Sequence, residues 1–183
     1  MPLLRELVNP QVHRGPLTSG GASVDMFIKI KATSQGMING ESQDIKHKNE
    51  IQAESFTWDV TQPIDSSGSG LATGRRKLGQ FKFLMTSCAA TPKLLQAACT
   101  GEVLSEVTIT VRKAGKDQQE YMVWKLVNGI VASIETGMID ANSGIPHDEI
   151  AISFRKIELT YKQQQADGTL GGGIMFVDEY NIN

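Results

Sequence analysis

The side chains that could bind a metal ion are few and far apart in this sequence. The histidines are His13, His47 and His147, and none has a second His or Cys at a metal-ligand spacing. We therefore expect surface or capping histidines rather than a zinc site. Cys88 and Cys99 flank a predicted short helix, whose rise would hold their Cα atoms too far apart for a disulfide unless the chain before it folds back. We expect two free, mostly buried thiols.

Carboxylates and glycine-rich runs could support hydrolysis or phosphate binding. Asp148-Glu149, and Glu41 with Asp44, form carboxylate pairs in predicted polar loops, where such pairs are usually solvated. Gly68-Ser69-Gly70 lacks the spacing of a nucleophile elbow, and Gly171-Gly172-Gly173 has no following Lys-Ser/Thr to cradle a phosphate. The sequence therefore predicts no catalytic, cofactor-binding or metal-binding residue, and we do not expect an enzyme.

Composition and charge narrow the class of protein. The 183 residues are 40% hydrophobic, which suits one domain with its own core. Acidic and basic residues, 20 and 18, are mixed along the chain, so we expect no nucleic-acid partner and no attraction to anionic membranes. No apolar run approaches the ~20 residues of a membrane helix, so we expect no membrane insertion.

The N-terminal residues 1–23 differ in composition from the rest. They contain several prolines and a Ser-Gly-Gly-Ala-Ser run but no apolar core of a secretory signal. We expect a flexible N-terminal extension over residues 1–23 and a single domain over residues 24–183.

A long β-hairpin over residues 102–137 organises the predicted fold. Its first arm alternates, with Val107, Ile109 and Val111 on one side and polar residues on the other. Its return arm is apolar on both sides, with Tyr121, Val123, Val127 and Val131 on one and Met122, Trp124, Leu126 and Ile130 on the other. Because a strand of an antiparallel sheet normally has one wet face, this arm needs a second surface to bury against.

The return arm therefore supplies candidates for the core or for a subunit interface, namely Tyr121, Met122, Trp124 and Leu126. An exposed apolar face of several hundred Å² is on the scale of an interaction site. The alternative is that the short helix alone covers this face.

Other apolar patterns predict strands over residues 24–30, 51–60, 80–86, 149–162 and 174–182, the last of them closing the sheet. Phase slips predict β-bulges near Glu54-Ser55 and at Arg155-Lys156. The mixed charges of residues 40–48 are typical of a solvated loop.

The helix is bounded by clear signals. Thr91 can cap it, Pro92 suits its first turn and Gly101 can end it, and at two to three turns it must lie on the sheet or plug a barrel end. We expect a mainly β fold with one short α-helix, either a closed or nearly closed antiparallel barrel or a tight two-sheet sandwich.

Five segments in order resemble the Hcp family, the haemolysin-coregulated proteins that form the tube of bacterial type VI secretion systems. They are Asp25-Met26-Phe27-Ile28-Lys29-Ile30, Gly40-Glu41-Ser42 with Lys46-His47, Phe56 with Trp58, Thr110-Val111-Arg112-Lys113-Ala114-Gly115, and Ala166-Asp167-Gly168 before Gly171-Gly172-Gly173. The likeness runs from about Val24 to Ile182.

The resemblance implies a β-barrel with one helix, assembled into homohexameric rings that stack into a tube. It implies secretion effectors in the lumen, sheath and spike proteins as partners, no cofactor, and cytoplasmic assembly followed by export without a signal peptide. It also implies roles for particular positions. Small polar residues on the second strand, Ser55 and Thr57, would face the lumen and cargo. The long loop from Asp59 to Gly79 would take part in ring stacking through Ser66, Gly68, Gly70, Arg75, Arg76 and Lys77.

Two alternatives stay open. The first is the tail tube protein of a phage or related contractile particle, which the family resembles. The second is a small β-barrel hydrolase or ligand-binding module that uses the Asp148-Glu149 loop.

Overall fold

The computed structural model describes residues 24–64, 74–113, 118–138, 144–165 and 168–180. Its elements are β1 (Val24–Ala32), β2 (Gly36–Ile38), β3 (Ile51–Thr57), β4 (Val60–Thr61), β5 (Lys77–Leu78), β6 (Phe81–Thr86), α1 (Thr91–Thr100), β7 (Val103–Lys113), β8 (Glu120–Gly137), β9 (His147–Ser153), β10 (Lys156–Gln164) and β11 (Leu170–Glu179). The extension predicted for residues 1–23 lies outside the described residues.

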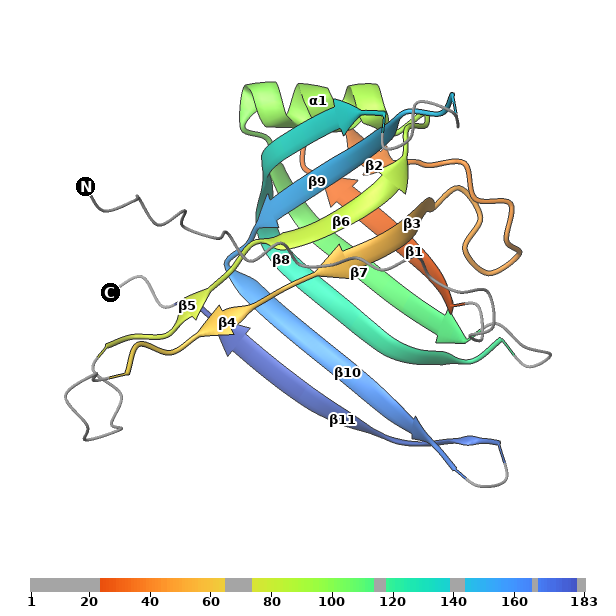
Figure 1. Cartoon of the computed structure of the whole chain (residues 1–183), viewed down its shortest axis with the longest axis vertical. Helices are drawn as coiled ribbons and strands as arrows, with labels where there is room; N and C mark the ends of the chain where they lie inside the picture. The colour runs from red at the N-terminus through yellow and green to blue at the C-terminus, as the bar shows by residue number, and fades with distance from the viewer. Residues whose placement is uncertain (1–23, 65–73, 114–117, 139–143, 166–167, 181–183) are drawn as a thin grey trace, which may run out of the picture.

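A closed antiparallel barrel forms the body of the molecule (Figure 1). It closes through the circuit β7–β1–β3–β6–β9–β8, in which β8 pairs with both β7 and β9. The inward side chains of these strands form one core, in which Phe81, Phe83 and Ile109 are at most 1% exposed. The barrel confirms the predicted fold class and decides against the tight two-sheet sandwich.

Strands β7 and β8 confirm the predicted hairpin, but β8 changes its inward face partway along. Trp124 and Val131 both lie in the core, whereas Ile130 is 42% exposed. Between them Asn128 has a φ of 52°, in the left-handed region, so the alternation is broken there. The sequence pattern assumed one unbroken alternation, so it placed Ile130 on the face of Trp124, where the structure has Val131.

Strands β9 and β10 lie end to end along β8. The register of pairing with β8 is the same on both sides of the interruption, which falls at Phe154 and Arg155. The bulge predicted at Arg155-Lys156 within one strand is therefore wrong, because the chain bends there without adding a residue opposite β8.

Beyond this bend, β10 and β11 form a hairpin that projects from the barrel (Figure 1). Strand β11 pairs only with β10 among the described strands, so its outer edge is open. The prediction that the last strand closes the sheet is wrong, since β9 makes the closing contact with β8.

The bulge predicted near Glu54-Ser55 is confirmed, because the pairing of β3 with β6 shifts between Ala53 and Ser55. Two strand pairings were missed. Residues 36–38 form β2 against β1, and the segment expected to be an unstructured loop contains the short pair β4–β5.

Helix α1 lies across one end of the barrel, as expected, and buries Leu94 and Ala97 in the core (Figure 1). Gly101 ends it with a φ of 64°. The capping prediction for Thr91 is wrong, because Thr91 is the first helical residue and the N-cap, Ala90, makes no side-chain bond. Both cysteines are free as expected, but Cys99 is exposed and Cys88 only partly buried.

Candidate functional site

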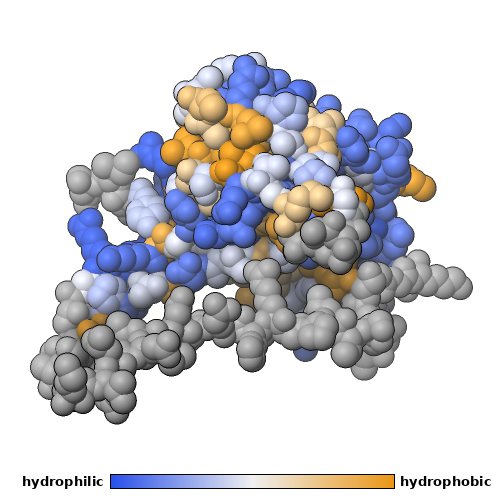
Figure 2. Space-filling view, turned by 45° about the horizontal axis from the view of Figure 1, so that its top comes forward, coloured by the Kyte–Doolittle hydropathy of each residue, from blue (hydrophilic) through white to orange (hydrophobic). Residues whose placement is uncertain are grey.

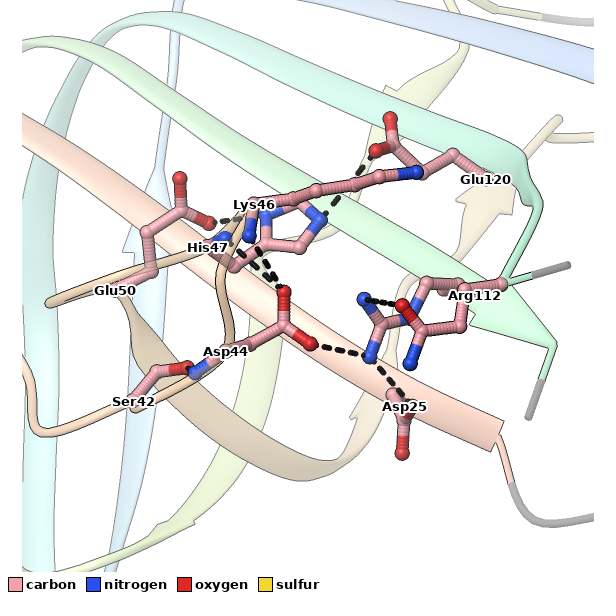
Figure 3. Close-up of polar contacts among 9 residues, drawn as sticks. Asp25, Ser42, Asp44, Lys46, His47, Glu50, Arg112 and Glu120 are labelled. Atoms are coloured by element: carbon pink, nitrogen blue, oxygen red, sulfur yellow. Dashed lines mark hydrogen bonds and ion pairs between the residues drawn. The ribbon is translucent and has the colours of Figure 1, made fainter. Parts of the chain in front are cut away.

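A buried polar cluster lies on the outer side of the barrel wall, with Arg112 at its centre (Figure 3). The Arg112 side chain is 3% exposed and donates to the carboxylates of Asp25 at 2.9 Å and Asp44 at 2.8 Å. Its guanidinium also lies 4.8 Å from the centre of the Phe27 ring. Asp25 and Phe27 belong to β1, Arg112 to β7 and Asp44 to the segment after β2, so the ion pairs fasten that segment to the barrel.

The Arg112 cluster controls the ionisation of Asp44. The hydrogen bond from Arg112 is the main cause that lowers the pKa of Asp44 from its ordinary 3.8 to about 2, and the backbone N–H groups of Lys46 and His47 add to it. Asp44 is therefore ionised, and its ion pair with Arg112 links the segment after β2 to the barrel wall.

His47 completes the cluster. Its ring stacks on Phe27 with a centroid distance of 4.2 Å and an angle of 6° between the planes. Its Nδ1 lies 2.8 Å from a carboxylate oxygen of Glu50, and its Nε2 lies 3.4 Å from one of Glu120, at the start of β8. The ring is thus stacked on Phe27 and lies between the carboxylates of Glu50 and Glu120, which Figure 3 shows on either side of it.

Residues 40–48 form a loop, as predicted, but only part of it is solvated: Ser42 and His47 are only 4% and 6% exposed, because Asp44 pairs with Arg112 of the barrel and His47 stacks on Phe27. His47 is therefore buried rather than on the surface. Phe27 was the missed signal, since it is an apolar residue on the outward face of β1 and needs a cover. Three of the segments that carry the family resemblance, around Asp25, His47 and Arg112, meet in this cluster.

The carboxylates of Asp148 and Glu149 do not form an acid–base pair. Both belong to strand β9 rather than to a loop, so their side chains point to opposite faces. Asp148 is fully buried and accepts hydrogen bonds from the hydroxyls of Ser87, Thr91 and Thr136. Its role is to fasten the start of α1 to the barrel.

The outer wall of β3, β6 and β9 carries the predicted lumen residues. Ser55 is half-buried and Thr57 exposed, and they face outward opposite Leu84 and Lys82 of β6. Glu149 lies on the same wall, with its carboxylate 3.8 Å from the Lys82 ammonium. This wall is a pleated surface of short polar and paired charged side chains.

The hairpin β10–β11 carries what we call the apolar ribbon, residues 174–177 of β11. Ile174 and Phe176, on one face, are 69% and 42% exposed, and Met175 and Val177, on the other, are 63% and 49% exposed. The end of the molecule that carries α1 is instead mostly hydrophilic, with apolar patches between (Figure 2). The prediction of a strand that is apolar on both faces concerned the return arm, and the apolar ribbon of β11 was not singled out from the sequence.

The return-arm candidates divide between core and surface. Trp124 and Leu126 lie in the barrel core and Met122 packs against it, whereas Tyr121 is half-buried with its ring centre 6.3 Å from that of Tyr161 on β10. Helix α1 lies at the other end of the barrel, so it does not cover the outward face of residues 121–127 (Figure 1).

Residues 59–64 and 74–79 form what we call the arm, which leaves the barrel with β4 and β5 (Figure 1). Its base closes where the Gly79 N–H donates to the Asp59 carbonyl at 2.8 Å. Arg75 and Lys77 are exposed, and Arg76 forms an ion pair with Asp178 of β11. The other predicted stacking residues, Ser66, Gly68 and Gly70, lie outside the described residues.

Within the described ranges, no group of three or more His, Cys, Asp or Glu side chains is arranged to hold a metal ion. The same ranges contain no helix long and apolar enough to cross a bilayer.

Comparisons with known proteins agree with this geometry. A family model described as "Type VI secretion system effector, Hcp" matches residues 27–161. Protein hcp1 of Pseudomonas aeruginosa is 31% identical over 153 residues, which cover 82% of this chain and 91% of that protein. The Major exported protein of the same organism is 25% identical over 159 residues, covering 78% and 92%.

Solved structures give the same result. The crystal structure of a type VI secretion system effector from Yersinia pestis matches with a TM-score of 0.68 and 29% identity, over 85% of this chain and 100% of that one. The chain therefore belongs to the Hcp family of type VI secretion systems.

Proposed function

We propose that the protein is a structural subunit of a type VI secretion tube and that it assembles into homohexameric rings that stack. The observation that carries this proposal is the apolar ribbon, because four consecutive large apolar residues lie on both faces of a strand outside the barrel. Leaving such surface in water costs about 25 cal/mol per Å², so a neighbouring subunit that covers it stabilises the assembly. A ribbon that meets a different patch on its neighbour closes into a ring when the rotation permits.

In these rings the outer wall of β3, β6 and β9 faces the lumen, with Ser55 and Thr57 toward the effectors. The support for this is that the wall is mostly polar, lacks a strong net charge, and has its charged side chains paired, Lys82 with Glu149 and Glu54 with His147. Such a wall tolerates different cargo without binding one kind tightly. The role is structural rather than enzymatic, since Asp148 and Glu149 point away from each other.

Type VI secretion also supplies the remaining partners and the location. The tube would assemble in the cytoplasm, contact sheath and spike proteins, and leave the cell without a signal peptide. A relative named Major exported protein supports export. The family match favours this role over a phage tail tube.

Electron microscopy of purified protein tests the proposal directly. We expect rings, and stacks of rings at high concentration. Fields of single particles without rings would contradict the proposal.

We expect the arm to serve stacking rather than ring closure, because it projects from the barrel on its own strand pair. Deleting residues 66–74 should leave ring mass unchanged in sedimentation and shorten the stacks seen by microscopy. If the deletion abolished the rings themselves, the proposal that the arm serves stacking and not ring closure would be wrong.

A further inference from the structure

The arm is not free at its base but touches β11 at regularly spaced positions. Phe176, Asp178 and Tyr180 follow one another at every second residue, so they share one face of the strand. Along this face the ring of Phe176 lies 6.4 Å from that of Trp58, Asp178 meets Arg76, and Tyr180 meets Leu78. Three alternate residues, two on β11 and Tyr180 just after it, therefore each contact a different residue of the arm or its base.

The ion pair is the most directional of these contacts. The Nε and a terminal nitrogen of Arg76 each donate to one oxygen of the Asp178 carboxylate. Such a two-point pairing fixes the angle between the groups as well as their distance. The pairing raises the pKa of Arg76 and lowers that of Asp178, so both stay charged in the neutral range.

Tyr180 adds a second fixed point. Its hydroxyl accepts from the Leu78 N–H at 2.9 Å and donates to the Leu78 carbonyl at 3.1 Å, so it holds both backbone groups of one residue of β5. Its own N–H donates to the carbonyl of Arg155 at 2.8 Å, at the bend between β9 and β10. The arm is thereby tied to the point where the projecting hairpin leaves the barrel.

We propose that Arg76, Asp178, Tyr180 and Leu78 form a joint that sets the direction of the arm from the position of β11, so that ring closure along β11 orients the arm for stacking. This proposal rests on the proposed function. The apolar ribbon lies on β11 directly before Asp178 of the joint. When the ribbon is fixed against a neighbouring subunit, the part of the chain that holds the arm is therefore fixed as well.

The test uses the full chain with Asp178→Asn and, separately, Tyr180→Phe. The matched control is Glu179→Gln, which removes one carboxylate charge from the adjacent residue on the opposite face of β11. Ring mass is measured by sedimentation, stack length by electron microscopy, and the order of the arm by hydrogen exchange of the Leu78 amide.

We expect rings of wild-type mass in all variants. Asp178→Asn and Tyr180→Phe should lose most stacks and exchange the Leu78 amide faster, whereas Glu179→Gln should match the wild type. The double reversal Arg76→Asp with Asp178→Arg should restore stacking, which a general loss of stability would not allow.

The outcomes separate the two proposals. Wild-type protein without rings or stacks contradicts the proposed function. Rings with wild-type stacking in both Asp178→Asn and Tyr180→Phe contradict the joint alone. Loss of rings in Asp178→Asn but not in Glu179→Gln also overturns the joint, because the ion pair would then belong to the contact between subunits.

Discussion

Large apolar side chains are buried in the closed barrel but exposed on the hairpin β10–β11. In the barrel every strand of the circuit has two neighbours, and inward residues such as Ile28 and Ile150 are fully buried. In the hairpin β11 has one neighbour among the described strands, and Ile174 and Met175 are more than half exposed. The barrel therefore buries its apolar side chains within one chain, whereas the hairpin leaves apolar side chains exposed.

The outside of the barrel follows the same rule. Where the outward face of β1 carries an apolar residue, Phe27, the segment holding His47 and Asp44 folds over it. No described segment does the same for residues 174–177 of β11. Single apolar side chains such as Ile45 and Ile64 are also exposed, but residues 174–177 form a run of four consecutive exposed apolar residues.

The largest expected effect lies in the barrel. Replacing Trp124 with Asp puts an unpaired charge in the core and should cost more than about 4 kcal/mol of unfolding free energy, enough to prevent folding. Urea unfolding followed by fluorescence and circular dichroism measures it. The matched change on the ribbon, Ile174→Asp, should keep the wild-type midpoint, and a soluble Trp124→Asp with that midpoint would show that the site is not core.

We expect an effect of intermediate size on the apolar ribbon, where substitutions should change assembly rather than folding. The pair Met175→Ser and Val177→Ser should leave the melting temperature of the subunit nearly unchanged and abolish rings, because about half of the exposed apolar ribbon is removed. Sedimentation measures the assembly. Val103→Ser, an equally exposed valine on the barrel, is the control, and rings that survive the ribbon variant but not the control would reverse our assignment.

The smallest effect is a pH dependence in the Arg112 cluster. Because the pKa of Asp44 falls to about 2 in the fold from an ordinary 3.8, its contribution is complete above about pH 4 and disappears as the pH falls toward 2. Asp44→Asn should therefore be less stable than the wild type at neutral pH, and the difference should shrink between about pH 4 and pH 2. Thermal melts across this range measure the difference in stability between the two proteins. A difference that does not vary with pH would show that ionisation of Asp44 does not contribute to stability.

The sequence predicted the parts of the fold that depend on local pattern. The β7–β8 hairpin, the bulge beside Ser55 and the end of α1 at Gly101 follow from alternation, a phase slip and a glycine. The change of inward face on β8 could not be predicted this way, because it depends on a left-handed Asn128, and asparagine adopts that conformation only in some contexts.

The candidate site was harder to predict because it depends on contacts between distant residues. Arg112 and Asp44 lie far apart in the sequence, and a run of mixed charges looks the same whether water or a buried guanidinium pairs with it. The apolar ribbon of β11 was not singled out for a similar reason, since residues 174–177 and the return arm are both apolar in sequence and only closure of the barrel decides which side chains are enclosed.

Mass measurement of the wild-type protein in native buffer, over a series of concentrations, tests the role of the ribbon most directly. We expect a hexamer that persists as the protein is diluted into the micromolar range. A monomer at high micromolar concentration, with the ribbon exposed and the protein soluble, would contradict the proposal that β11 requires a neighbouring subunit.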